Sequence, residues 1–238
     1  ADASVGTAKL AATSVTAAKL NNDIISGTTA LAEEPADTDE FLLSDGGTLK
    51  RIDYSYIKGG GGLIHIKTQT ISSGVSSVDF IHGTSDVVFD STYNAYKLVI
   101  SDMHIATDAQ KPHIRFKDDG DFMGSNYQFT GTTRDTNGTE TNFASNTDSD
   151  IRILNDALGN ATVETFSAEI YFHKPSTTDT YKVVHGTFSG FDSDTLNIGG
   201  YFSGTNSGTT NALTGFQIRS GSGNIDKGNF SLYGLSTS

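Results

Sequence analysis

The sequence contains no cysteine and only three prolines among its 238 residues. The lack of cysteine excludes disulfide bonds, thiolate nucleophiles and zinc–thiolate sites together. An extracellular protein held together by disulfides is therefore excluded. A protein that is built in a reducing cytoplasm and released later is compatible with this composition.

Long apolar runs and segments of positive charge are also missing. No run approaches the roughly 20 apolar residues that a membrane-spanning helix needs. The formal net charge is −12, and both the part up to Gly62 and the rest of the chain are acidic. No segment therefore carries the basic field that would neutralise phosphates. We expect neither nucleic-acid binding nor membrane insertion, and the acidic surface favours solubility.

Glycine, threonine, serine and asparagine are abundant, and this composition is typical of short strands joined by tight turns. Apolar residues recur with a period of two after Gly62, most clearly in Phe166–Phe172, which Pro175 is expected to end. Further strands are predicted at Tyr181–Phe191, Leu196–Phe202, Leu213–Arg219 and Phe230–Leu235. The count of roughly ten strands predicts an all-β fold with a C-terminal antiparallel β-sandwich of the jelly-roll kind.

The N-terminus contains two copies of a ten-residue unit in Val5–Leu20. Such a repeat cannot bury its own apolar side chains and must stack on neighbours or on other chains. An amphipathic helix is the alternative, but glycine, serine and threonine in the unit disfavour it. We predict a shaft that becomes stable by winding with identical chains through Val5, Leu10, Val15 and Leu20.

Four segments follow from these patterns. Residues 1–32 are predicted to form the repeat shaft, and residues 33–58 a small β insert with a hairpin around Ser44–Gly47. Residues 59–62 are four glycines, which indicate a flexible joint. A phosphate-binding loop would need a lysine followed by serine or threonine directly after the glycines, and then a helix, whereas Leu63 follows Gly62 and a strand is expected there. Residues 63–238 are predicted to form the sandwich.

Three segments resemble fibre and tail-fibre proteins of tailed bacteriophages, notably marine ones. They are the repeat Val5–Leu20, the segment Thr38–Ile52 and the ending Gly228–Leu235. The resemblance implies a homotrimeric virion fibre whose N-terminal end contacts other virion proteins and whose distal β domain contacts the bacterial surface. It also implies assembly in the host cytoplasm and a final place outside the cell, on the particle.

Receptor binding is expected at two polar segments. The segment Gly131–Asp150 is predicted to be a long loop with hydrogen-bonding side chains and one aromatic ring, which suit sugar hydroxyls. The alternative is a merely solvated or disordered loop. The second segment starts at Tyr201-Phe202, although these rings could instead belong to the core. The candidate receptor-binding residues are Arg134, Asp135, Asn137, Glu140, Asn142, Phe143, Tyr201 and Asn206.

No pattern for a metal, a cofactor or a catalytic site emerges. Asp118–Asp121 is rich in carboxylates but lacks the spacing of a calcium loop, so a hairpin turn is predicted. The six histidines lack zinc-site spacing, and a ring of one histidine from each of three chains is the less favoured alternative. A glycan depolymerase would need a carboxylate pair, and carboxylates are abundant. However, no Gly-x-Ser-x-Gly motif and no β-helix repeats beyond the first 20 residues are present.

The sequence therefore predicts a structural virion fibre protein, not an enzyme, that attaches to carbohydrate or lipopolysaccharide on a host surface. A capsid or tail decoration protein without a receptor role is the alternative. The chain opens Ala1-Asp2-Ala3 without a methionine, and two repeats are few for a shaft. We therefore expect the chain to belong to a longer fibre.

Overall fold

The computed structural model describes residues 29–57 and 62–235. The chain divides into two compact units, Ala1–Gly59 and Gly60–Ser238, so the division falls within the four glycines. The predicted shaft residues Val5, Leu10, Val15 and Leu20 lie outside the described residues.

The first unit contains a two-stranded hairpin, as predicted for this segment. Strand β1 (Glu40–Asp45) pairs with β2 (Thr48–Asp53), and the short helix α2 (Tyr54–Ile57) follows. Gly46 and Gly47 form the two-residue turn with φ values of 57° and 85°, a conformation that glycine adopts without strain. None of the described residues of this unit is buried. The hairpin therefore has no core of its own among these residues.

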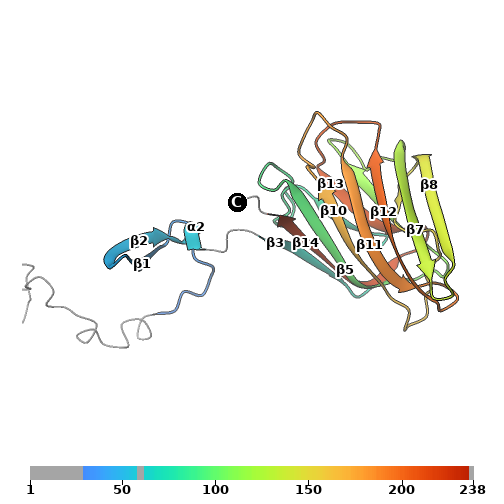
Figure 1. Cartoon of the computed structure of the whole chain (residues 1–238), viewed down its shortest axis with the longest axis horizontal. Helices are drawn as coiled ribbons and strands as arrows, with labels where there is room; N and C mark the ends of the chain where they lie inside the picture. The colour runs from blue at the N-terminus through green and yellow to red at the C-terminus, as the bar shows by residue number, and fades with distance from the viewer. Residues whose placement is uncertain (1–28, 58–61, 236–238) are drawn as a thin grey trace, which may run out of the picture. The chain divides into compact units, whose positions relative to one another are not determined.

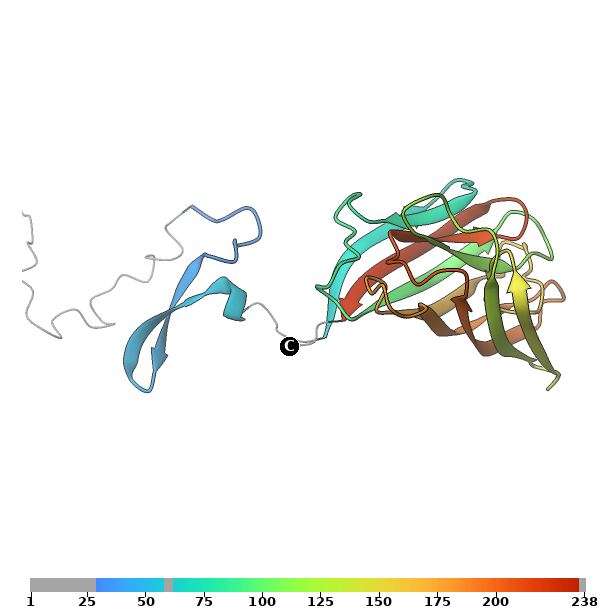
Figure 2. The same ribbon diagram turned by 90° about the horizontal axis from the view of Figure 1, so that it is seen from above.

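The second unit is all-β and antiparallel, which confirms the predicted class (Figure 1). Its larger sheet has eight strands in the order β3-β14-β5-β10-β11-β12-β7-β8. Their bounds are β3 (Leu63–Ile71), β5 (Ala95–Ile105), β7 (Tyr127–Asp135), β8 (Glu140–Asp148), β10 (Phe166–His173), β11 (Val183–Phe191), β12 (Asn197–Asn206) and β14 (Ile225–Leu235). Figure 2 shows the two edges of this sheet far apart, with β3 in teal and the β7–β8 hairpin in yellow-green.

The smaller sheet has four strands in the order β4-β13-β6-β9. Their bounds are β4 (Ser77–Ile81), β6 (Pro112–Lys117), β9 (Ile151–Arg152) and β13 (Gly215–Ser220). Alternate residues of both sheets are buried, and their aromatic rings pack together. The Phe172 ring of the larger sheet lies 4.1 Å, centroid to centroid, from the Phe216 ring of the smaller sheet. The hydrophobic core therefore lies between the two sheets, as in a β-sandwich.

One sequence-based expectation about the local structure is wrong. Gly131–Asp150 is not a long loop, because most of it belongs to strands β7 and β8, which pair from Tyr127 to Asp148. The two strands form an edge of the larger sheet. One side of each strand is exposed there, so threonine, asparagine and serine outnumber apolar residues, and the segment reads as polar. The long strand Phe166–Phe172 was predicted correctly, and β10 ends at His173, before Pro175.

Candidate functional site

The side of the larger sheet that points away from the smaller sheet is here called the outer face. The strand register places its side chains in rows that cross neighbouring strands. In one row, Thr187 of β11 stands opposite Tyr201 of β12, Tyr201 opposite Thr132 of β7, and Thr132 opposite Asn142 of β8. Residues that are up to about 70 positions apart in the sequence thus become direct neighbours.

A hollow of about 330 Å³ lies at this row. Its lining residues include Thr130, Thr132, Asn142 and Tyr201, and the Tyr201 side chain is 60% exposed although it stands in the middle of the sheet. We call this hollow, together with its four named residues, the Tyr201 site.

Hydrogen bonds orient the polar groups of the Tyr201 site. The Thr132 hydroxyl donates to Asn142 Oδ1 at 2.7 Å, and its oxygen lies 3.3 Å from the Tyr201 hydroxyl. Within the described residues, the Asn142 amide nitrogen has no hydrogen-bond partner. Its two N–H groups are therefore available to a ligand, next to an exposed aromatic ring.

Four other predicted receptor residues lie near the hairpin that joins β7 and β8. Arg134 and Glu140 are exposed and stand opposite each other in the next row. Asp135 accepts a hydrogen bond from the Thr139 amide at 2.8 Å, so it stabilises the turn. Asn137 is exposed in that turn. The structure therefore places these residues at the β7–β8 end of the outer face, on strands and a short turn and not on the long loop that the sequence analysis expected.

Phe143 and Asn206, in contrast, are buried. Phe143 is 6% exposed and its ring lies 6.1 Å from that of Phe129 in the core. Asn206 is 3% exposed and its amide nitrogen donates to the Ser125 carbonyl oxygen at 2.8 Å. Phe143 is among the residues that line the Tyr201 site, but at 6% exposure it offers little surface to a ligand, and Asn206 lines none of the hollows on the outer face. The sequence signal that could have identified strand β8 is the single aromatic ring, Phe143, among small or polar residues in Thr141–Ser145. Phe143 takes the inward position of this strand.

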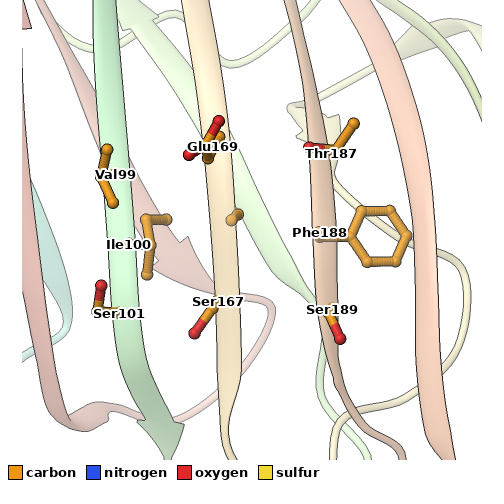
Figure 3. Close-up of a pocket in the computed structure, with 9 residues that line it drawn as sticks. Val99, Ile100, Ser101, Ser167, Glu169, Thr187, Phe188 and Ser189 are labelled. Atoms are coloured by element: carbon orange, nitrogen blue, oxygen red, sulfur yellow. The ribbon is translucent and has the colours of Figure 1, made fainter.

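The outer face has two further hollows that the sequence analysis did not predict. One of about 310 Å³ adjoins the Tyr201 site through Thr130 and is lined mainly by small polar residues: Gln128, Thr130, Ser145, Asn146, Ser203 and Thr205. The other, of about 330 Å³, lies over β5, β10 and β11 (Figure 3). Figure 3 shows Ser101, Ser167 and Ser189 on these three neighbouring strands, with Glu169 and Thr187 beyond them.

Planar rings lie beside the hollow of Figure 3. The Tyr171 and His185 rings are 5.3 Å apart and within 12° of parallel, and His173 lies 4.9 Å from His185 at 9°. Burial and the neighbouring charge of His185 lower the pKa of His173. The Lys97 ammonium sits 5.4 Å from the centre of the Tyr171 ring.

The charged groups of the outer face are mostly balanced. The Lys97 ammonium lies 2.9 Å from the Glu169 carboxylate, and the hydrogen bond with Glu169 is the main cause that raises the pKa of Lys97. Arg134 faces Glu140 across β7 and β8. This balance contrasts with the net charge of −12 of the chain. The face therefore suits an uncharged ligand rich in hydrogen-bonding groups better than a strongly charged one.

One histidine–aspartate pair lies beside a hollow of about 640 Å³ at the ends of β5 and β14. His104 Nδ1 lies 2.8 Å from Asp226 Oδ1, and His104 Nε2 lies 2.9 Å from the Ala161 carbonyl oxygen. Burial lowers the pKa of His104, but the hydrogen bonds to Asp226 and Ala161 outweigh it and raise the pKa above its ordinary value. A catalytic base needs a free nitrogen that faces the nucleophile. Because both ring nitrogens are engaged, this pair is a structural one.

No group of three or more metal-ligating side chains is found in residues 29–57 and 62–235. No helix in the described part of the chain has the length and apolar character needed to cross a membrane. Comparison of the chain with protein-family models, with curated proteins and with solved structures gave no match.

Proposed function

We propose that this chain is a structural fibre protein of a bacteriophage particle that displays its β-sandwich for attachment to carbohydrate on a host surface. In this proposal, three copies assemble through the N-terminal region, which also contacts other virion proteins. The resemblance of Val5–Leu20, Thr38–Ile52 and Gly228–Leu235 to phage fibre proteins supports the location on a virion. The outer face of the sandwich supports the attachment role.

The Tyr201 site is the observation that carries the carbohydrate proposal. Sugar rings offer an apolar C–H face together with several hydroxyl groups. An exposed tyrosine ring supplies a flat apolar surface, and the neighbouring Asn142 amide and Thr130 hydroxyl supply hydrogen-bonding groups. A shallow site with one aromatic surface and a few oriented polar groups matches that chemistry. The adjoining hollow at Thr130 extends the surface along β7, which gives room for more than one sugar unit.

The first unit supports the assembly part of the proposal. Its two-stranded hairpin exposes Leu42 at 75% and Leu49 at 70%, and the helix α2 that follows exposes Tyr56 at 78%. An isolated hairpin of this kind is marginally stable in water. Contacts with the same hairpin of other copies would remove these side chains from water. Three linked sandwiches would then bind a repetitive glycan with higher avidity than one.

The carbohydrate proposal is tested by Tyr201→Ala in the full chain. The variant removes the flat apolar surface without disturbing the core, because the ring is exposed. We expect affinity for polysaccharide or lipopolysaccharide from host cells to fall about tenfold or more, which corresponds to about 1.4 kcal/mol. Surface plasmon resonance on immobilised glycans, preceded by an oligosaccharide array to identify the ligand, measures the change.

Tyr181→Ala is the matched control, because Tyr181 is also exposed, at 53%, and lines none of the three outer-face hollows. Equal losses for both variants would contradict the assignment of the Tyr201 site. Failure of the wild-type chain to bind any host glycan would contradict the attachment role and favour a decoration protein.

A further inference from the structure

A separate hollow of about 310 Å³ lies at the end of the smaller sheet. Three basic side chains line it: Lys111, just before β6; His113, in β6; and Arg152, in β9. The register places His113 opposite Arg152, and Gly221 follows directly after β13. We call this hollow the basic hollow. Its other lining residues are Ala109 and Gln110, so no carboxylate lines it.

The positive charge of the basic hollow is poorly neutralised. Within the described residues, no carboxylate lies within 4.0 Å of the Lys111 ammonium, and the nearest to the Arg152 guanidinium, on Asp148, is 3.8 Å away. Burial and the charge of Arg152 lower the pKa of Lys111, and the opposite charge of Asp156 offsets this only in part. Keeping two like charges close together is unfavourable unless an anion joins them.

The aspartate next to His113 does not supply that anion. Asp150 lies 2.9 Å from His113 Nδ1, but its other oxygen lies 3.0 Å from the guanidinium of Arg219 and 3.2 Å from that of Arg115. Its charge is thus shared among three partners. His113 Nε2 has no hydrogen-bond partner in the described part of the chain. The overall composition, with 28 acidic and 16 Lys or Arg residues, makes a basic cluster of this kind unusual in the molecule.

We propose that the basic hollow binds a phosphate group, either free or carried by a sugar. The guanidinium of Arg152 offers paired N–H donors that match two phosphate oxygens, and the Lys111 ammonium adds a point charge. The volume of the hollow falls at the lower end of small-molecule pockets, about 300–1,000 Å³, so it is large enough for a sugar attached to the phosphate. The basic hollow belongs to the smaller sheet, whereas the Tyr201 site belongs to the larger one, so the two sites are tested independently.

The test uses the full chain and inorganic phosphate as the first probe. Isothermal titration calorimetry at constant ionic strength, adjusted with sodium chloride, separates specific binding from general screening. We expect saturable binding that weakens about tenfold or more in Lys111→Gln and in Arg152→Gln, because each variant removes a charge-assisted contact. Lys174→Gln is the control: it changes the net charge by the same amount, at an exposed position just after β10 that lines none of the hollows described above. Circular dichroism verifies that each variant is folded.

Glucose 6-phosphate and glucose distinguish the two sources of phosphate. Tighter binding of glucose 6-phosphate than of inorganic phosphate assigns the basic hollow to a phosphorylated sugar, and equal binding assigns it to free phosphate. The proposal is overturned if wild-type protein shows no saturable binding of either phosphate. It is also overturned if glucose binds as well as its phosphate, or if Lys174→Gln weakens binding as much as Arg152→Gln. None of these outcomes affects the test of the Tyr201 site.

Discussion

Asp150 is a buried carboxylate in contact with two guanidinium groups and one histidine ring. Its side chain is 6% exposed and lies within 3.2 Å of His113, Arg115 and Arg219. Burial alone would raise the pKa of Asp150. The close contact with His113 and the charges of Arg115 and Arg219 outweigh burial and lower the pKa of Asp150 below its ordinary value. The ionised form is therefore the one that the folded protein stabilises.

We predict that Asp150→Asn lowers the free energy of unfolding by about 3–5 kcal/mol at pH 7, because it leaves the guanidinium groups of Arg115 and Arg219 without their buried carboxylate. Because the pKa of Asp150 is lower in the folded than in the unfolded protein, its ionised form stabilises the fold at pH values above the ordinary carboxyl pKa. This stabilisation is lost as the pH falls through the pKa that Asp150 has in the folded protein. The difference between wild type and Asp150→Asn should therefore shrink in acid. Urea denaturation at pH 7 and at acidic pH measures both effects.

Asp148→Asn is the control for this residue. The Asp148 side chain is 28% exposed and lies 3.8 Å from Arg152, so its removal should change the stability by less than about 1 kcal/mol. Equal stability of the two variants would contradict a stabilising role for the contacts of buried Asp150 with His113, Arg115 and Arg219.

At the scale of the strand, β12 shows why neighbouring glycines have different roles. Gly199 and Gly200 stand on opposite sides of the larger sheet. A Cβ atom at Gly200 would overlap the carbonyl oxygen of Thr132 and lie 2.7 Å from Cζ of Phe188, whereas one at Gly199 would meet its nearest atom at 3.5 Å. Gly200 thus allows β7 and β12 to approach closely beneath Tyr201, and Gly199 is not required by packing.

We predict that Gly200→Ala destabilises the protein by about 1–3 kcal/mol, because it overfills a packed interior. Gly199→Ala should be nearly neutral or slightly stabilising, because alanine loses less backbone entropy than glycine on folding. Thermal denaturation of the two variants, which differ by one position, makes the comparison. Similar melting temperatures would contradict the close packing of β7 against β12.

At the scale of the whole molecule, the two units differ in how well they bury their apolar residues. The sandwich has a large core, whereas the described part of the first unit has no buried residue. The proposed trimer would explain this difference, because the sandwich folds around its own core and the hairpin needs other copies.

We predict that light scattering of the full chain gives three times the 25.2 kDa mass of one chain. Replacing both Leu42 and Leu49 with serine should shift the equilibrium towards the monomer at low protein concentration, because it removes apolar area from the proposed contact. Val163→Ser, at a 78% exposed position of the sandwich, is the control and should leave the mass unchanged. A monomeric wild-type chain would contradict the trimer.

The sequence by itself determined the all-β class, the hairpin around Ser44–Gly47 and the end of the long strand before Pro175. These are local properties, because side-chain alternation and turn chemistry depend on neighbours along the chain. The sequence did not reveal that Gly131–Asp150 forms most of a hairpin, because an edge strand with one solvated side has the same polar composition as a loop.

Only the tertiary structure decided which residues meet across strands. The row that joins Tyr201, Thr132 and Asn142 follows from strand order and register, and these depend on how the core packs. The same packing turned Phe143 and Asn206 inward, so that two of the eight predicted receptor residues became part of the interior. It also brought Lys111 and Arg152 to one hollow, although 41 positions separate them in the sequence. Non-local pairing of this kind leaves no periodic signal in the sequence, because each contact is set by strands that are distant along the chain.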